Sequence, residues 1–153
     1  MPVADNPNST SPNPISAAQF ALDLTGITAF FMEASGFENS TEVITHVMQD
    51  KQGKRIYQKL PGNTKWSDIS LKRGFTDDDA LWKWRKQVLD GQIDAARKDG
   101  TITGYDTKGN PVVQYTFSRG WISSWKAAGF NAKNNDVAVE EITITHEGLD
   151  RMK

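Results

Sequence analysis

The chain has 153 residues, of which 37% are hydrophobic and 24% charged, and its formal net charge is -1 at pH 7. This length predicts one domain with a buried core, and no apolar run approaches the roughly 20 residues that a membrane-spanning helix needs. Cysteine is absent, which excludes disulfides, thiolate nucleophiles and the usual thiolate zinc sites.

The N-terminal segment, residues 1–16, is rich in Pro, Asn and Ser. Such a composition cannot bury enough apolar surface to fold, so we expect a flexible arm followed by one folded domain over residues 17–153. The segment has no basic stretch followed by an apolar one, so it is not expected to act as a secretory signal.

Alternation of apolar and polar residues predicts the first two strands at residues 17–24 and 27–34, paired as a hairpin. Gln19, Ala21 and Asp23 lie on the face of the first strand opposite to its larger apolar side chains. We therefore expect this small and polar face to be turned toward water.

A second hairpin is predicted from strands at residues 42–48 and 55–60, which flank a polar, exposed loop at residues 49–54. Residues 60–63, Leu-Pro-Gly-Asn, are typical of a turn, because Pro fixes one backbone angle and Gly and Asn tolerate positive φ. A half-buried strand is then expected at residues 67–74. Its alternation places three side chains on one face: Ile69, Leu71 and Arg73.

One helix is predicted after this strand. Thr76 is the expected N-cap, and the acidic residues 77–79 would lie where the helix dipole favours negative charge. Apolar side chains recur at helical spacing over residues 81–93, which gives the helix a wide apolar face. Gly91 either ends or weakens the helix, and Gly100 is a later candidate for its C-terminal cap.

A third hairpin is expected from strands at residues 101–105 and 111–117, and a final strand at residues 137–145. In the final strand the apolar phase shifts between Val139 and Ile142, which predicts a bulge or burial on both faces. The predicted fold class is α+β and mostly β, with antiparallel sheets that form a barrel or sandwich and one main helix packed against it.

Few residues are available for catalysis. The histidines are His46 and His146, and His146 with Glu147 is the best acid–base pair. Adjacent residues of a strand point to opposite faces, so we favour a histidine at a strand end or an interface. The acidic residues 77–79 are better explained by the helix dipole than by a metal ion. No phosphate-binding or dinucleotide-binding motif occurs, so no catalytic residue, cofactor or metal site is predicted.

Basic residues are interleaved with Trp in four segments, which is similar to the stacking platforms of nucleic-acid-binding modules. The segments are Lys65-Trp66, residues 82–86, residues 119–121 and Trp125-Lys126. Residues 51–98 carry twelve basic and six acidic side chains, whereas residues 1–50 contain no Lys or Arg. For the Trp residues we favour a place in a core or subunit interface. For the charges, one interpretation is that unlike surfaces meet between copies of the same protein. Solvated charge without a partner explains the charge pattern equally well, and nucleic-acid binding is the alternative function.

Several segments together identify a family. They are LPGNTKWSDISLKRG at residues 60–74, TDDDALWKW at residues 76–84, DTKGNPVVQYTF at residues 106–117, and the stretch over residues 117–149. In matching order over about residues 20–151, the chain closely resembles the tail-tube family of contractile phage tails and phage-tail-like contractile injection systems.

The resemblance implies a non-enzymatic building block with the tail-tube fold. Members of this family form hexameric rings that stack into a rigid, hollow inner tube within a contractile sheath, and sheath contraction drives the tube through a target envelope. The implied partners are further copies of the chain, the sheath protein, the baseplate and terminator or cap proteins, with possible cargo in the lumen. No membrane insertion of the monomer is implied. Assembly in the bacterial cytoplasm is expected, in a particle that is then released or anchored to a membrane.

The resemblance also implies where two functional surfaces lie. The predicted hairpin tip corresponds to the long loop that family members place at the contact between rings: Asp50, Lys51, Gln52, Gly53, Lys54 and Arg55. The small and polar face of the first strand suits the lumen of a wide barrel: Gln19, Ala21 and Asp23.

Overall fold

The computed structural model describes residues 17–74, 76, 78–127 and 138–152, so the predicted arm at residues 1–16 lies outside the described residues. In chain order the elements are β1 (Gln19–Leu24), β2 (Ile27–Phe31), β3 (Glu33–Ser35), β4 (Asn39–Gln49), β5 (Arg55–Trp66), β6 (Ile69–Gly74), α1 (Ala80–Leu89), α2 (Ile93–Ala96), β7 (Lys98–Tyr105), β8 (Pro111–Ala127), β9 (Val139–Thr145) and β10 (Gly148–Arg151).

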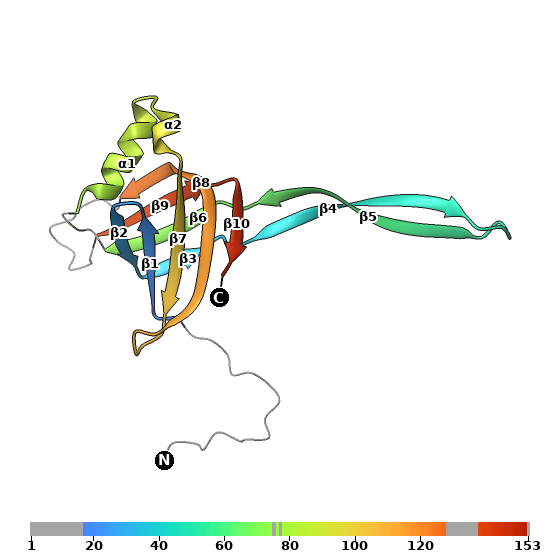
Figure 1. Cartoon of the computed structure of the whole chain (residues 1–153), viewed down its shortest axis with the longest axis horizontal. Coiled ribbons are helices and arrows are strands. Elements are labelled where there is room, and N and C mark those ends of the chain that lie inside the picture. Colours follow the sequence, from blue (N-terminus) through green and yellow to red (C-terminus); the bar gives the residue numbers. More distant parts are fainter. Residues whose placement is uncertain (1–16, 75, 77, 128–137, 153) are drawn as a thin grey trace, which may run out of the picture.

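The strands form two layers and a separate two-stranded ribbon (Figure 1). Layer 1 contains β2, β1, β7, the first half of β8, and β10, whereas layer 2 contains the second half of β8, then β9, β6 and β3. In Figure 1 the strands of layer 1 run vertically and those of layer 2 run across them. The predicted fold class, antiparallel and mostly β, is confirmed. The architecture is a sandwich, and no closed barrel is detected in the described part of the chain.

One corner of the sandwich is formed by β8, which passes from layer 1 to layer 2. Its residues 111–120 pair with β7, and its residues 121–127 pair with β9. Arg119 adopts a φ of 51° at the bend, and the register with β9 shifts between Ile122 and Ser124. The predicted third hairpin is therefore confirmed, but its second strand is much longer than the sequence pattern indicates.

The opposite corner is formed by the segment predicted as one strand at residues 27–34. The structure divides it at Met32 into β2, which pairs with β1, and β3, which pairs with β6. The Met32 N–H donates a hydrogen bond to the Lys72 carbonyl at 2.9 Å, which links this corner to layer 2. The predicted hairpin of the first two strands is confirmed, with a change of partner halfway along the second.

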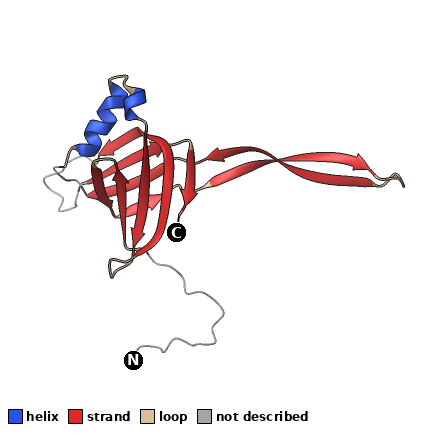
Figure 2. Ribbon diagram, viewed as in Figure 1, coloured by secondary structure: helices blue, strands red, loops and turns tan. Residues whose placement is uncertain are grey.

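The hydrophobic core fills the space between the layers. Strand β6 alternates as predicted, with Ile69 and Leu71 fully buried and Arg73 on the same face. Helix α1 packs against one end of the sandwich (Figure 2) and adds Leu81 and Trp84 to the core, which confirms its apolar face. The core consists of Leu22, Leu24, Ala29, Phe31, Ile69, Leu71, Leu81, Trp84, Ala96, Ile102, Phe117, Ile122, Ile142 and Ile144.

Helix α1 begins at Ala80, so the predicted cap at Thr76 is wrong. The Thr76 Oγ1 accepts a hydrogen bond from the Asp78 N–H at 3.0 Å, and the Asp78 Oδ1 accepts one from the Ala80 N–H at 3.1 Å. These bonds stabilise two successive turns before the helix, as short polar side chains often do. Asp79 occupies the N-cap position without a side-chain capping bond, and Asp77 lies outside the described residues.

Helix α1 ends where Gly91 adopts a φ of +81°, so the earlier of the two predicted ends is confirmed. The sequence pattern does not predict α2, which is held by a hydrogen bond from the Trp84 Nε1 to the Ala96 carbonyl at 2.6 Å. Gly100 is not a cap, because it lies in β7 where the Phe117 ring fills the space of a β-carbon. Among the described residues, no helix is both long and apolar enough to span a membrane.

Strand β9 alternates regularly from Val139, with Glu140 and Ile142 buried on one face, so the prediction of a bulge or of burial on both faces in this strand is wrong. The apolar phase shifts in the sequence because Glu140 takes a core position. It is the register partner of Arg73 on β6, and the Arg73 Nε donates to the Glu140 Oε2 at 3.0 Å. Residue 137, where the strand was predicted to begin, lies outside the described residues.

Candidate assembly site

The ribbon of β4 and β5 projects away from the two layers (Figures 1 and 2). All residues of β4 are exposed, and so are all residues of β5 except Gly62, which is partly exposed. Within the described residues the two strands pair only with each other. The predicted second hairpin is confirmed and is longer at its base, with strands of 11 and 12 residues.

The predicted turn at residues 60–63 is wrong, because these residues belong to β5. Pro61 is the register partner of Val43, and the register shifts between Thr41 and Val43. Proline has no N–H to donate, so a strand tolerates it at a bulge or where one edge is free. Strand β5 offers both conditions, since no second strand pairs with it in the part of the chain that the structure describes.

Both faces of the ribbon carry apolar pairs across the two strands. Val47 is opposite Tyr57 on one face, and Met48 is opposite Ile56 on the other. Nearer the base, the same two faces carry the pairs Val43 with Pro61 and Ile44 with Leu60. The polar pairs between them are Thr45 with Lys59 and His46 with Gln58. The ribbon therefore has no polar face that could remain in water while the other is buried.

The apolar side chains of the ribbon are without cover in the single chain. Seven of them expose at least 40% of their surface: Val43, Ile44, Val47, Met48, Ile56, Tyr57 and Leu60. A two-stranded ribbon is at best marginally stable alone in water, and contiguous exposed apolar surface marks a site of protein association. Burying each large side chain stabilises a complex by about 1.5–3 kcal/mol. The ribbon is therefore a candidate assembly surface, with apolar side chains to cover on both faces.

The tip of the ribbon is a short, ordered turn. The Asp50 Oδ1 accepts hydrogen bonds from the Gln52 and Lys54 N–H groups at 2.9 and 2.8 Å, and Gly53 adopts a φ of +79°. Lys51, Lys54 and Arg55 are exposed around this turn. The six residues predicted for the hairpin tip thus lie together at the far end of the ribbon, and the tip is basic.

The predicted water-facing side of β1 is exposed unevenly. Gln19 is exposed and Asp23 partly exposed, but Ala21 exposes only 2% of its surface. Ala21 is small and lies between its register partners, Phe30 on β2 and Thr103 on β7. The lumen-facing role of these residues stays a prediction.

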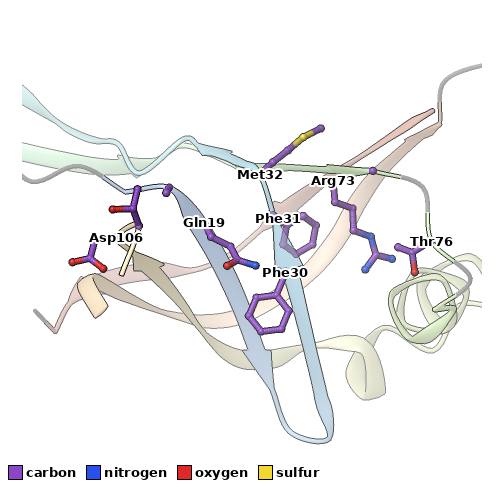
Figure 3. A pocket seen from close by; sticks show the side chains of 10 residues that line it. Gln19, Phe30, Phe31, Met32, Arg73, Thr76 and Asp106 are labelled. Atoms are coloured by element: carbon purple, nitrogen blue, oxygen red, sulfur yellow. The ribbon is translucent and has the colours of Figure 1, made fainter. Parts of the chain in front are cut away.

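An open cavity of about 570 Å³ lies between β1, β2 and the end of β6 (Figure 3). It is lined by Ala18, Gln19, Phe30, Phe31, Met32, Arg73, Gly74, Thr76, Asp106 and Thr107. The Arg73 guanidinium, the one basic group among these residues, is already bonded to Glu140. The lining has no nucleophile paired with a base, and the described residues contain no cluster of three or more potential metal ligands.

His146 and Glu147 do not form an acid–base pair. The His146 Nε2 lies 3.0 Å from the Ser67 carbonyl oxygen, in a mostly buried position at the end of β9. The Glu147 Oε2 instead lies 2.8 Å from the Arg119 Nε. The interpretation of His146 as a strand-end histidine is confirmed.

Several of the Trp residues near basic side chains belong to the core or pack against it. Trp84 is 1% exposed in the core. Trp82 is exposed and contacts Trp125 edge-on, with ring centroids 5.3 Å apart. The preference for core or interface aromatics is confirmed for Trp84, and Trp121 and Trp125 pack against the core. For Trp82 it stays a prediction.

The fold and the ribbon define a class of protein, namely a structural subunit whose function is carried by contacts with other subunits. The family model described as T4-like virus tail tube protein gp19 matches residues 16–150, and the chain belongs to this family. It is a tail tube subunit of a contractile phage tail or phage-like injection system, and hence a structural protein and not an enzyme.

Solved structures with this fold include parts of contractile particles. A chain of the sheath-tube complex of PVC, an extracellular contractile injection system in its extended state, is 26% identical with a TM-score of 0.73, covering 91% of each chain. A chain of the tube-terminating cap of the anti-feeding prophage is 22% identical with a TM-score of 0.72, covering 100% of this chain and 99% of that chain. Hcp1 from Flavobacterium johnsoniae is 16% identical with a TM-score of 0.56, covering 87% and 94%. No curated protein sequence matches significantly.

Proposed function

We propose that the chain forms hexameric rings that stack into the hollow inner tube of a contractile particle. A contractile sheath surrounds the tube, a baseplate and a terminator or cap protein close its ends, and sheath contraction drives it through a target envelope with possible cargo in the lumen. Assembly takes place in the bacterial cytoplasm, and the tube is part of a phage or of a phage-tail-like particle.

The observation that carries this proposal is the ribbon with apolar pairs on both faces. A ribbon that docked on one surface would need only one apolar face. Cover on two faces is expected when a ribbon is held between neighbouring subunits, as in stacked rings, because each neighbour then buries one face.

Electron microscopy of the purified chain, free of nucleic acid, tests the proposal. Rings of six with a central pore, alone or stacked, are the expected result. Persistent monomers over a wide range of protein concentration would contradict it. Assembly that appeared only after nucleic acid was added would favour the alternative of a nucleic-acid-binding module, whose binding is strongly salt-dependent.

The basic tip of the ribbon is expected to meet acidic groups of the adjacent ring. Replacing Lys51, Lys54 and Arg55 together with Glu should block stacking but leave single rings, because like charges would then face each other. The variant with Lys51→Arg, Lys54→Arg and Arg55→Lys keeps the charge and should form tubes. Electron micrographs at about 0.15 M salt distinguish rings from tubes, and tubes of normal length from the charge-reversed variant would count against this contact.

We further propose that Gln19, Ala21 and Asp23 face the lumen. A Gln19→Cys variant should react with a bulky maleimide as a monomer and be protected in assembled tubes, whose lumen the reagent enters slowly. Equal labelling of monomers and tubes would argue against a luminal position for this face.

A further inference from the structure

One face of the ribbon carries a histidine between its apolar pairs. His46 on β4 is the register partner of Gln58 on β5, and an apolar pair lies on each side of them on the same face. Each of these four apolar side chains exposes at least 40% of its surface. We call the six residues the histidine face: Ile44, His46, Met48, Ile56, Gln58 and Leu60.

The histidine face carries no charge when His46 is neutral. The nearest charged residues on this side of the ribbon are Glu42 toward the base, and Asp50 and Lys54 at the tip. Each lies four strand positions from His46 or Gln58, which is about 13 Å at about 3.3 Å per residue. Charges so far apart in water are largely screened at physiological salt.

The two layers of the sandwich add no charged group to the histidine face. The ribbon projects away from both layers (Figure 1), and within the described residues its strands pair only with each other. A positive charge on His46 therefore has no carboxylate to pair with in its own chain. If another surface covered the histidine face, this charge would be buried without a partner.

The opposite face of the ribbon differs at the corresponding position. There the polar pair between the apolar pairs is Thr45 with Lys59. Lysine stays charged between about pH 5 and 8, and its long aliphatic stem lets the ammonium group reach water at the rim of a contact. An imidazole is shorter and changes its charge within this range. Of the two faces, the histidine face is thus the one that switches between uncharged and charged near neutral pH.

We propose that His46 is a pH switch of assembly. An apolar surface of a neighbouring copy covers the histidine face while His46 is neutral, and protonation of His46 releases it. The inference rests on the proposed function, because it requires a second copy that covers the ribbon. Burying an unpaired charge costs far more free energy than burying a neutral imidazole. Assembly is therefore strong above the pH range in which histidine titrates, and it weakens as the pH falls through that range.

Proton linkage gives the expected size of the effect. When only the neutral imidazole can be covered, each pH unit below the titration range of histidine lowers the association constant up to about tenfold per covered face. Carboxylates ordinarily titrate near pH 4. Apart from the terminal amino group, the two histidines are therefore the groups of this sequence that ordinarily change charge between about pH 7.5 and 5.5.

Sedimentation velocity at these two pH values and equal salt tests the switch. The lowest protein concentration at which the wild-type chain assembles should rise about tenfold at the lower pH. The variant with His46→Gln has a polar side chain that never becomes charged. It should assemble at the same protein concentration at both pH values.

A second variant moves the imidazole without removing it from the histidine face. His46→Gln combined with Gln58→His exchanges the two side chains of one register pair, so the composition of the face is unchanged. Because the imidazole again lies between the two apolar pairs, assembly of this exchanged variant should weaken about tenfold at the lower pH, as in the wild type.

The other histidine provides the competing explanation. The His146 Nδ1 is buried and has no hydrogen-bond partner in the part of the chain that the structure describes. Acid that acted through His146 would weaken the assembly of the wild-type chain and of the His46→Gln variant alike. Circular dichroism of both monomers at both pH values should show the same folded state, so that a difference in assembly is assigned to the histidine face.

The outcomes separate this inference from the proposed function. The pH switch is overturned, and the tube function stands, if the wild-type chain assembles equally well or better at the lower pH. The same holds if the His46→Gln variant keeps the acid response or the exchanged variant lacks it. If the wild-type chain forms no rings at the higher pH at any concentration, both proposals are overturned.

Discussion

A variant with Val47→Ser and Tyr57→Ser is expected to form no tubes under conditions in which the wild-type chain assembles completely. The two side chains are direct partners across the ribbon and expose 51% and 61% of their surface. Neither belongs to the hydrophobic core, so the unfolding temperature of the monomer should not change. The substitutions therefore separate assembly from folding.

The expected size of the effect follows from the surface that each contact would bury. About half of each side chain is still exposed in the monomer, so loss of the two removes about 1.5–3 kcal/mol per contact. At about 1.4 kcal/mol per factor of ten, the association constant falls by at least about 10-fold. Because every subunit of a tube repeats the contact, sedimentation velocity and electron microscopy should both detect the loss.

The matched control lies on the same face of the ribbon. Thr45 and Lys59 form the polar pair between the two apolar pairs, and Thr45→Ser with Lys59→Ser removes little apolar surface. This variant should assemble at nearly the wild-type protein concentration. Tubes from the Val47 and Tyr57 variant at that same concentration would show that the apolar pairs do not drive assembly.

Replacing Glu140 with Ala is expected to lower the free energy of unfolding by about 3–5 kcal/mol. Arg73 and Glu140 are 6% and 5% exposed, and the Arg73 guanidinium also lies 5.6 Å from the centre of the Phe31 ring. Its Nη2 is 3.4 Å from the Asp78 carbonyl oxygen, just before helix α1. Without Glu140, the buried Arg73 guanidinium has no carboxylate to pair with, and this unpaired charge lowers the free energy of unfolding. Urea unfolding followed by circular dichroism measures the loss.

Replacing both Arg73 and Glu140 tests whether the unpaired charge, and not poor packing, lowers the free energy of unfolding. The double variant Arg73→Met with Glu140→Leu leaves no unpaired charge in the core, and such replacements of buried ion pairs are often neutral or stabilising. We expect it to be more stable than the variant with Glu140→Ala alone. A double variant that is no more stable than the single one would mean that shape, and not charge pairing, determines this site.

The elements best predicted from the sequence are those in which local pattern and tertiary environment agree. Strand β6 alternates strictly, and burial follows it from Ile69 to Arg73. Helix α1 has its apolar side chains at helical spacing and a glycine, Gly91, in the left-handed region after its last turn. In such segments the local preference already specifies the buried face.

The wrong predictions arise where a distant partner decides the structure. Pro61 and Gly62 are typical turn residues, but here they continue β5. A ribbon with an unpaired edge tolerates a bulge and a proline, which has no N–H to donate. Glu140 interrupts the apolar pattern of β9 and is buried nonetheless, because Arg73 lies opposite on β6. No local pattern contains the information that these two charges meet.

The geometry of the candidate assembly site could be predicted in part. The hairpin and its basic tip at residues 50–55 follow from the polar loop with Gly53. The two apolar faces were missed, although a signal exists in the consecutive apolar pairs Val43-Ile44 and Val47-Met48. Adjacent strand residues point to opposite sides, so such pairs indicate burial on both faces.

The two corners of the sandwich have a mechanical consequence. Strand β8 belongs to both layers, and the segment from β2 to β3 crosses between them at the opposite corner. If one layer slid over the other, the continuous main chain would have to bend or the hydrogen bonds between strands would have to break. Two layers held together only by packed side chains would slide more easily. A subunit of this kind resists shear between its layers through its connectivity, without any covalent cross-link.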